Sequence, residues 1–498
     1  MKKFYKTVFI VTLFSVCEKF LGFLYRIYLS RAVGAEGVGI YQVALSVFGL
    51  IFTVICSGTP ITVSRLMTKY NAEGNLTKKR KVITAGICFT LGLSLPVCLL
   101  FFAFSSKLSF IFADDRCLPV FLIILPGLIF TSVYSVLRGV FWGNKDFLPY
   151  SVTELLEEAC MIIVGVVLIS NSSSVFQGAF SAGVAVLISY IFSFTLALTI
   201  FFIRKNKLVN PVSEFKPLLS SALPVTAMRS VNSLSSSLLS IVLPMRLIYY
   251  GFTESSAITA FGSAVGQAMP LLSIPTSLIG SFILVMVPEI SENFYSKNNL
   301  RLKSDIEKAL KFTCFLSCLF VPLFTVMGEE IGTMVFNSYE CGKFLSKSAF
   351  LMIFMGLLGI TTSILNSIGG EKRVLVYTAI CGGLMLLSVW FLPSVMGINS
   401  LIVGYFFAFG LTTILNLLLM YKLSPIKFKF SKFFALSLLF LLPSTLLGFM
   451  LEKMLLNLIG KFFTIIFVGT VTITFNALLY VGGNLINVDF IKTKLKKA

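Results

Sequence analysis

The sequence from Ala159 to Ile203 reads ACMIIVGVVLISNSSSVFQGAFSAGVAVLISYIFSFTLALTIFFI and contains no charged side chain. A helix crosses the hydrocarbon core of a bilayer with about 20 apolar residues, so this stretch is long enough for two crossings. The polar run Asn171-Ser-Ser-Ser interrupts it near the middle. Such a run predicts a turn outside the hydrocarbon, and the whole stretch is therefore interpreted as a membrane hairpin.

The rest of the chain has the same character. A second uncharged stretch runs from Val374 to Tyr421 and is interrupted between Pro393 and Asn399. Of the 498 residues, 57% are hydrophobic and only 12% are charged, whereas a soluble domain has about 25% charged residues. This composition excludes an ordinary soluble fold and predicts an all-α polytopic membrane protein.

We expect about fourteen transmembrane helices. Their predicted ranges are 7–30, 40–63, 82–104, 119–141, 150–170, 178–203, 218–243, 258–288, 312–328, 348–368, 374–392, 400–421, 433–451 and 462–482.

The basic residues lie mainly between these segments and predict the orientation of the chain. The net charge is +20, but a nucleic-acid partner would need a basic face on a soluble fold, so none is expected. With the N-terminus inside, the cytoplasmic segments hold 29 Lys and Arg residues and the outer segments hold eight. Basic loops favour the cytoplasmic side. Both termini are therefore predicted to be cytoplasmic.

Several kinds of chemistry lack their usual residues. The chain has no histidine and no GxxxxGK[ST] phosphate loop, which argues against a histidine-based catalytic site and ATP hydrolysis by that route. The ten cysteines include no CxxC pair. No catalytic residue, metal or cofactor is predicted. Cys117 and Cys341 lie in corresponding outer loops and are interpreted as two unpaired thiols, or as a pair that meets when an outer gate closes.

Three anchors suggest an internal repeat. Arg26-Ile-Tyr aligns with Arg246-Leu-Ile, Val63-Ser-Arg-Leu-Met with Val287-Pro-Glu-Ile-Ser, and Gly143-Asn-Lys with Gly370-Glu-Lys. Their order and slowly growing offset predict two related halves, as in many transporters. The expected domains are an N-terminal six-helix lobe (1–215), a C-terminal six-helix lobe (216–428), and two extra helices with a basic cytoplasmic tail (429–498).

A few cations fall inside the predicted spans. An ionisable residue in a membrane helix costs at least about 2.5–3.5 kcal/mol on insertion scales, so it usually faces protein or water and marks function. Lys19, Arg26 and Arg229 are the candidate substrate-binding cations. Arg26 has an alternative interpretation as a cation that snorkels to the outer interface. Polar neighbours expected to line a cavity, or to act as helix-packing contacts, are Ser15, Gln42, Asn232 and Gln267.

Three glutamates begin the fifth predicted span. Glu154, Glu157 or Glu158 could bind a coupling cation or proton, and no coupling ion is specified by the sequence. The alternative is a solvated acidic helix N-terminus, which the helix dipole favours. Arg138, in the fourth predicted span, is interpreted as an anchor beside Trp142.

Four segments carry a resemblance to a known family. They are Phe20-Leu-Gly-Phe-Leu-Tyr-Arg, Gly58-Thr-Pro-Ile-Thr-Val-Ser-Arg-Leu, Leu223-Pro-Val-Thr-Ala-Met-Arg-Ser, and Pro270-Leu-Leu-Ser-Ile-Pro-Thr followed by Val287-Pro-Glu-Ile-Ser-Glu. Together they resemble the polysaccharide-transporter branch, similar to stage V sporulation protein B, of the multidrug/oligosaccharidyl-lipid/polysaccharide (MOP) flippase superfamily, which is related to lipid II flippases.

The resemblance implies a fold and a function. The implied fold is a V of two six-helix lobes around a cavity, with two further helices, and the implied cargo is an undecaprenyl-diphosphate-linked sugar. Lys19 and Arg26 match the basic pattern of the family's first helix. Tyr25 departs from it, because some members carry a charge there.

We therefore predict a flippase, not an enzyme, that moves a polyprenyl-diphosphate-linked saccharide (lipid II or another envelope or spore-wall precursor) by alternating access. The alternatives are a cation-coupled multidrug exporter, a membrane glycosyltransferase or polymerase, and a scaffold for wall-synthesis enzymes. Its expected partners are the lipid-linked oligosaccharide, the bilayer and cell-wall synthesis enzymes. A monomer in the bacterial cytoplasmic membrane is expected.

Overall fold

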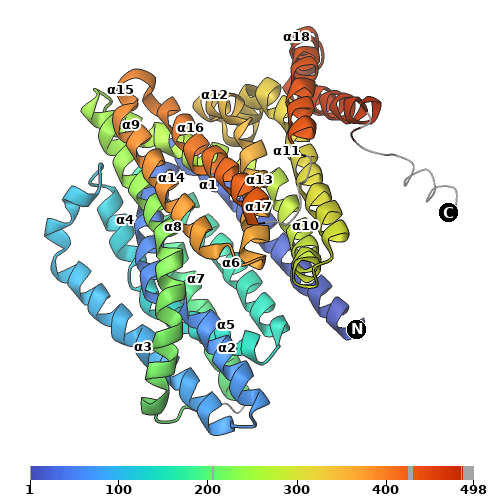
Figure 1. Ribbon diagram of the computed structural model, residues 1–498. Helices are drawn as coiled ribbons and strands as arrows, with labels where there is room; N and C mark the ends of the chain where they lie inside the picture. The colour runs from blue at the N-terminus through green and yellow to red at the C-terminus, as the bar shows by residue number, and fades with distance from the viewer. Residues whose placement is uncertain (1, 205–206, 424–429, 484, 486–498) are drawn as a thin grey trace. The chain divides into compact units, whose positions relative to one another are not determined.

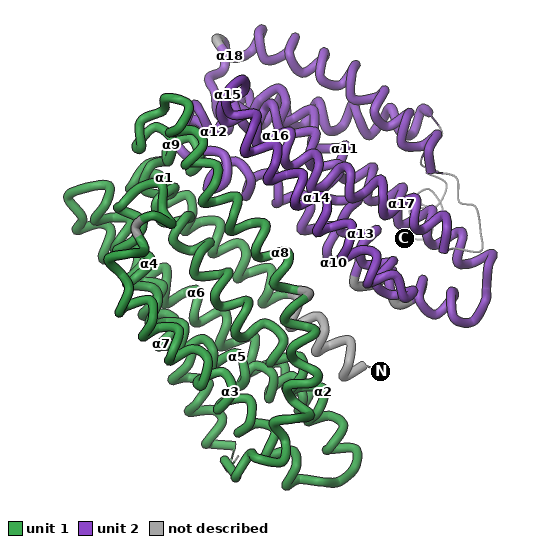
Figure 2. The backbone as a smooth tube through the Cα atoms, turned by 60° about the vertical axis from the view of Figure 1, so that its left-hand side comes forward, with its two compact units in different colours: residues 1–262 green, residues 263–498 purple. Residues whose placement is uncertain are grey.

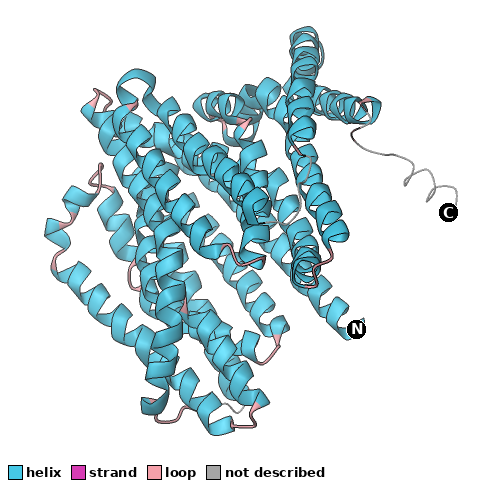
Figure 3. Cartoon of the chain, viewed as in Figure 1, coloured by secondary structure: helices cyan, strands magenta, loops and turns pink. Residues whose placement is uncertain are grey.

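The computed structural model of the protein describes residues 2–204, 207–423, 430–483 and 485. Its elements are helices, and no strand occurs within these ranges (Figure 3). In chain order they are α1 (Lys2–Cys56), α2 (Thr59–Ala72), α3 (Leu76–Ala103), η1 (Ser105–Lys107), η2 (Ser109–Ile111), α4 (Cys117–Ile124), α5 (Gly127–Gly143), α6 (Phe147–Ser170), α7 (Val175–Ile203), η3 (Val212–Glu214), α8 (Phe215–Tyr249), α9 (Glu254–Phe261), η4 (Gly262–Ala268), α10 (Met269–Tyr295), α11 (Asn299–Phe336), α12 (Tyr339–Ser348), α13 (Leu351–Ser367), α14 (Glu371–Phe391), α15 (Pro393–Met396), η5 (Gly397–Asn399), α16 (Ser400–Tyr405), η6 (Phe406–Leu411), α17 (Thr412–Leu423) and α18 (Ser431–Gly482) (Figure 1).

The predicted all-α polytopic fold is confirmed. Among the described residues ten helices are long and apolar enough to cross a membrane, or up to twelve if each of two bent helix pairs is one span. One of these, Leu13–Ala72, has 60 residues, which is enough for two crossings of about 20. Helix α1 breaks inside it at Gly34, where φ is 68° and ψ is 180°. Helix α6, with 24 residues and three glutamates, lies outside the twelve and matches the fifth predicted span, so the structure has room for all fourteen.

The chain forms two compact units, Met1–Gly262 (unit 1) and Ser263–Ala498 (unit 2), which Figure 2 shows in different colours. Unit 1 contains α1 to α9, so it includes the seventh predicted span. The boundary between the units follows packing, whereas the predicted lobes 1–215 and 216–428 follow the sequence repeat. The lobe division stays a prediction.

Glycines bring α9 close to α1 in unit 1. A Cβ on Gly39 would lie 2.3 Å from the carbonyl oxygen of Ile258, and one on Gly262 would lie 2.0 Å from the carbonyl oxygen of Ala35. Real side chains do not tolerate such distances from backbone atoms. Small residues allow this close backbone approach between membrane helices, so these two glycines set the spacing of α1 and α9.

An ionic cluster joins three loops at the same end of unit 1. Arg116 binds Glu36 at 2.7 Å and Asp114 at 2.7 Å, and the hydroxyl of Ser255 donates to Glu36 at 2.7 Å. Asp114 is buried, so the paired cation offsets the cost of removing its charge from water. The hydrogen bond to Asp114 also raises the pKa of Arg116 above its ordinary value. The cluster ties the break in α1 to the loop before α4 and to the start of α9.

Hydroxyl groups attach α8 to α1 along its length. Ser237 donates to the carbonyl oxygen of Ser46 at 2.6 Å, and Ser240 donates to the Ser46 hydroxyl at 2.9 Å. Further along, the amide of Gly58 donates to Thr226 at 3.1 Å. These bonds explain why the seventh predicted span packs with unit 1. They also support the packing interpretation for the small hydroxyl residues of this helix.

In unit 2 the two extra C-terminal helices form α18, which breaks at Gly460 (φ 76°). Helix α18 packs on α11: the Asn476 side-chain amide donates to the carbonyl oxygen of Cys318 at 2.9 Å, and the rings of Phe315 and Tyr480 are 4.9 Å apart. The extra helices are therefore an integral part of unit 2.

Candidate functional site

Two of the predicted cations are exposed on unit 1. Lys19 and Arg229 each lie about halfway along a membrane helix, Lys19 in the part of α1 before Gly34 and Arg229 in α8. Arg229 donates one hydrogen bond to the carbonyl oxygen of Ser57, at 3.3 Å. Ser57 lies between α1 and α2, and Pro60 in the first turn of α2 lacks an N–H group that could donate to its carbonyl oxygen. The bond to Ser57 holds the Arg229 side chain in place, and the other N–H groups of its guanidinium can bind a ligand.

Arg26 has different surroundings. It is partly buried, and it interacts electrostatically with Tyr41 and Glu158. The snorkelling interpretation therefore fails to describe its full environment, because a carboxylate from α6 faces it inside unit 1.

The polar residues predicted to line a cavity differ in their burial and in the unit to which they belong. Ser15 and Gln42 are partly buried in unit 1, whereas Gln267 is fully buried in the π-helix η4 of unit 2. The side chain of Asn232 lies outside the described part of the chain. Whether these side chains line a common cavity stays a prediction.

The three glutamates of α6 are inside unit 1 rather than at a solvated helix end. Helix α6 begins at Phe147, so Glu154 lies about two turns into it, beyond the first turn where the dipole acts. Glu154 accepts a hydrogen bond from the Tyr134 hydroxyl at 2.6 Å and pairs with Arg138 at 3.6 Å. The alternative of a solvated acidic N-terminus is therefore wrong.

The other two glutamates extend this cluster toward α1 and α7. Glu157 is hydrogen-bonded to Ser193 of α7, and its Oε2 atom is buried with no hydrogen-bond partner among the described residues. Glu158 packs over Gly22, where an added Cβ would lie 2.8 Å from its Oε1 atom. Glu18 of α1 interacts electrostatically with both Glu154 and Arg138. The cluster formed by Glu18, Arg138, Glu154, Glu157 and Glu158 is named the carboxylate cluster below.

Arg138 is more than an interfacial anchor. Its guanidinium lies 5.3 Å from the centre of the Trp142 ring, as expected, but it also pairs with Glu154. The sequence analysis missed Tyr134 and Ser193 as partners. Tyr134 and Arg138 are four residues apart on α5 and so share a face, which was a signal available in the sequence. The predicted hairpin places α7 beside α6, but it does not specify that Ser193 faces Glu157. In the described part of the chain no group of three or more His, Cys, Asp or Glu side chains is arranged to hold a metal ion.

Solved structures share this architecture. A lipid II flippase MurJ in an inward closed conformation matches with a TM-score of 0.72 and 16% identity, over 95% of this chain and 99% of that chain. An inward-facing multidrug resistance MATE family transporter of the MOP superfamily matches with a TM-score of 0.66 and 15% identity, over 82% of this chain and 94% of that chain. At such identities the likeness shows the fold.

Proteins with related sequences include a sporulation protein and a lipid II flippase. Stage V sporulation protein B of Bacillus subtilis (strain 168) is 26% identical, over 86% of this chain and 86% of that protein. Lipid II flippase MurJ of the same organism is 23% identical, over 75% of this chain and 74% of that protein. With the charged groups inside its spans, these matches define the class: the chain is a multi-pass membrane protein with the fold that the MurJ and MATE structures share. It belongs to the polysaccharide biosynthesis protein family, whose profile matches residues 4–294.

Proposed function

We propose that this transporter is a flippase that moves a polyprenyl-diphosphate-linked saccharide, lipid II or another envelope or spore-wall precursor, across the membrane by alternating access. The family and the relationship to a lipid II flippase and to a sporulation protein support the proposal. The diphosphate of such a cargo is anionic, and the sugar is rich in hydroxyl groups. A protein that carries it needs cations and polar groups at membrane depth.

The exposed cations at mid-helix carry this proposal. Lys19 makes no ion pair with the described residues, and Arg229 keeps donors beyond its bond to Ser57. Holding such charges inside the membrane is costly, so a compensating anionic ligand accounts for their presence. Arg26, which already faces Glu158, is assigned a supporting role in the same substrate site, together with Ser15, Gln42 and Asn232 of unit 1.

Alanine at Lys19 or Arg229 is expected to lower flipping at least about tenfold, because each cation that binds a phosphate directly is worth roughly 1.5–3 kcal/mol. The measurement is the appearance of labelled lipid-linked saccharide in the outer leaflet of proteoliposomes. Lys107→Ala, in the outer element η1, is the matched control and should flip at the normal rate.

Two results would contradict the proposal. Wild-type protein that never exposes the labelled lipid would refute the cargo, and normal flipping by folded Arg229→Ala protein would remove that residue from the site. Drug resistance conferred on a pump-deleted host would favour a multidrug exporter instead. New glycosidic bonds would favour a glycosyltransferase or polymerase.

The carboxylate cluster is proposed to couple transport to a proton or a cation. Glu157 supports this, because its buried Oε2 atom has no partner in the described part of the chain and could accept a proton or contact an ion. Glu157→Gln keeps the shape of the side chain but cannot ionise. We expect it to abolish the acceleration of flipping by an imposed ion gradient, with flipping in the absence of a gradient retained.

The control for this experiment is Glu307→Gln, which removes a carboxylate paired with Lys311 at 3.3 Å in unit 2. Proton and sodium gradients are imposed separately, so that the coupling ion is identified. An undiminished response of Glu157→Gln to every gradient that accelerates the wild type would rule out Glu157 as the coupling residue.

The remaining assignments follow from the charge distribution and the repeat. We propose the bacterial cytoplasmic membrane as the location, with both termini inside because of the excess of basic residues in the alternate loops. The proposed transport lobes are 1–215 and 216–428, with 429–498 as an addition, and the proposed working form is a monomer that can cooperate with wall-synthesis enzymes.

A further inference from the structure

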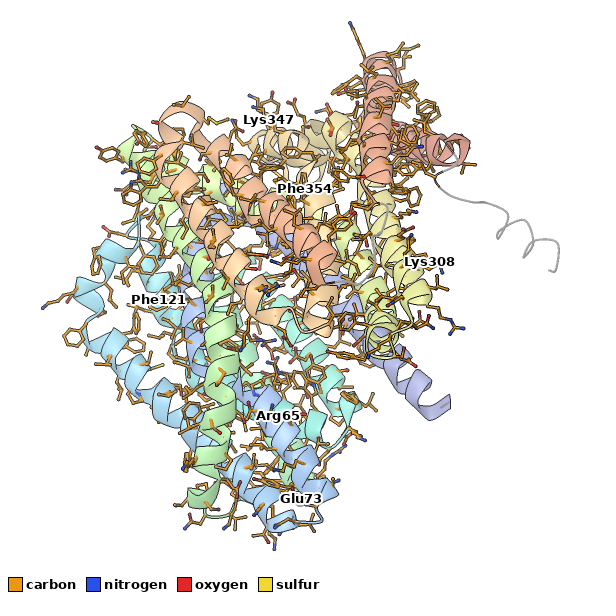
Figure 4. The ribbon with its side chains drawn as sticks, in the orientation of Figure 1. Arg65, Glu73, Phe121, Lys308, Lys347 and Phe354 are labelled. Carbon is orange, nitrogen blue, oxygen red and sulfur yellow. The ribbon has the colours of Figure 1, made fainter. Side chains whose placement is uncertain are left out.

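One connection in unit 1 carries a large excess of positive charge. Residues 65–81, which comprise the end of α2, the turn and the start of α3, are named the basic turn, and Arg65 and Glu73 mark its position in Figure 4. Glu73 is its only carboxylate. Its six basic residues are Arg65, Lys69, Lys78, Lys79, Arg80 and Lys81.

Protein carboxylates leave most of this charge uncompensated. In the described part of the chain the basic turn makes one ion pair, Lys69 with Glu73 at 3.9 Å, and both side chains are well exposed. The other contacts of these cations are with neutral groups, and the carboxylate of Glu214 accepts a hydrogen bond from the Tyr70 hydroxyl at 2.6 Å. Arg65 donates to Ser221 at 2.8 Å, Lys79 to Asn71 at 3.3 Å and Lys81 to Ser213 at 3.3 Å, and Lys78 lies 5.6 Å from the centre of the Tyr70 ring.

The corresponding connection in unit 2 shows that this type of turn does not require such an excess. By the predicted repeat, in which Val63 aligns with Val287, residues 289–305 are equivalent, and they contain three basic and three acidic residues. The next turns of the same helix pair their cations: Lys308 with Asp305 at 3.8 Å, and Lys311 with Glu307 at 3.3 Å. Lys308 is labelled in Figure 4. The excess of positive charge is therefore specific to the connection in unit 1 and is not required by the helix–turn–helix topology that both units share.

The length of α3 places its basic residues at the membrane surface. The helix has 28 residues and is therefore about 42 Å long, whereas the hydrocarbon core is about 30 Å thick. The apolar part begins at Val82, so Lys78 to Lys81 lie at the level of the lipid headgroups. They occupy the first turns of α3, where the helix dipole repels cations. An external anion would remove this repulsion.

We propose that the basic turn binds the anionic phospholipids of the leaflet that the charge census assigns to the cytoplasm. Each cation near an anionic surface strengthens membrane binding about fivefold. Leu76 is 58% exposed and Val212, in the segment that contacts α3 through Ser213, is 73% exposed. These apolar side chains would contact the acyl region beneath the headgroups, as in other interfacial anchors.

The phosphate of the lipid-linked cargo has similar chemistry, but the arrangement favours phospholipid. Lys79 and Lys81 are partly exposed and the other four cations are exposed, and their neutral partners lie on three separate elements, α2, η3 and α8. They are spread over a surface rather than converging on one point. Such a surface suits several lipid phosphates at once, whereas one diphosphate would need convergent donors.

The test uses the full-length protein, purified in mixed micelles that contain equal amounts of phosphatidylglycerol and phosphatidylcholine. The retained lipids are quantified by mass spectrometry after washing. The wild type should retain several-fold more phosphatidylglycerol than phosphatidylcholine. In a variant whose basic turn has lost four positive charges, this preference should fall at least about fivefold. The test variant is K78Q/K79Q/R80Q/K81Q. The matched control removes four basic residues of unit 2 and should keep the preference; it is K297Q/R301Q/K303Q/K372Q.

Two further arms keep the test decisive. Raising the salt concentration should reduce the lipid preference of the wild type itself, since exposed charges are screened. This measurement tests the proposal even if the variant misfolds. Farnesyl diphosphate is added as a soluble competitor. An equal loss of preference in both variants, a preference that salt leaves unchanged, or displacement of phosphatidylglycerol by micromolar farnesyl diphosphate would each overturn the assignment.

Discussion

Arg138→Ala is expected to destabilise unit 1 by about 3 kcal/mol, the usual cost of breaking a buried ion pair by removing one partner. The two side chains are only 24% and 18% exposed, so water can do little to replace the lost cation. Glu18 and Glu157 also interact with Arg138 electrostatically, so its removal takes a compensating positive charge from several carboxylates. The measurement is thermal unfolding of the purified protein in detergent.

A double-mutant cycle separates this electrostatic effect from lost packing. Glu154→Gln in the Arg138→Ala background should recover part of the loss, because the amide is neutral and can still accept the hydrogen bond of Tyr134. The recovery should be absent when Glu307→Gln is used instead. If the two losses simply add, Arg138 acts mainly through its contact with Trp142 and the ion pair contributes little.

Gly262→Ala is expected to have an effect of several kcal/mol for a different reason. The new Cβ would lie 2.0 Å from the carbonyl oxygen of Ala35 and 2.8 Å from the amide nitrogen of Gly39. Both neighbours are backbone atoms, so no rotamer change relieves the clash, and overpacking of this kind costs about 1–3 kcal/mol or more. Helix α9 must move away from α1. Thermal unfolding and the yield of folded monodisperse protein report the effect.

Gly49→Ala is the matched control, because Gly49 lies in the same helix as Gly39 and its added Cβ would meet nothing within 4 Å. It should be neutral or stabilising by up to about 1 kcal/mol, the propensity gain of alanine over glycine in a helix. Equal stability of Gly262→Ala and Gly49→Ala would mean that α9 is not held tightly on α1.

The ionic cluster around Arg116 and the basic turn show which features could not be predicted from the sequence. Glu36, Arg116 and Ser255 come from three distant parts of the chain, and no periodicity connects them. The basic turn was visible as a run of cations, and it was used to orient the chain. In the described part of the chain only Lys69 among its cations pairs with a carboxylate, and this became clear only when the neighbours from η3 and α8 were placed beside the turn.

The sequence by itself determined the class of fold, because the apolar content of each span depends on composition and length alone, and a bilayer imposes the same requirement on every crossing. It also determined which residues were candidates: Lys19, Arg26, Arg229 and the glutamates of α6 stand out wherever the helices lie. Only the tertiary structure decided their partners. It placed Glu154 against Tyr134 and Arg138, Glu158 over Gly22, and Arg229 on the carbonyl of Ser57. The reason is physical: insertion energy is local to each helix, whereas ion pairs and hydrogen bonds depend on which helices pack together and on which face.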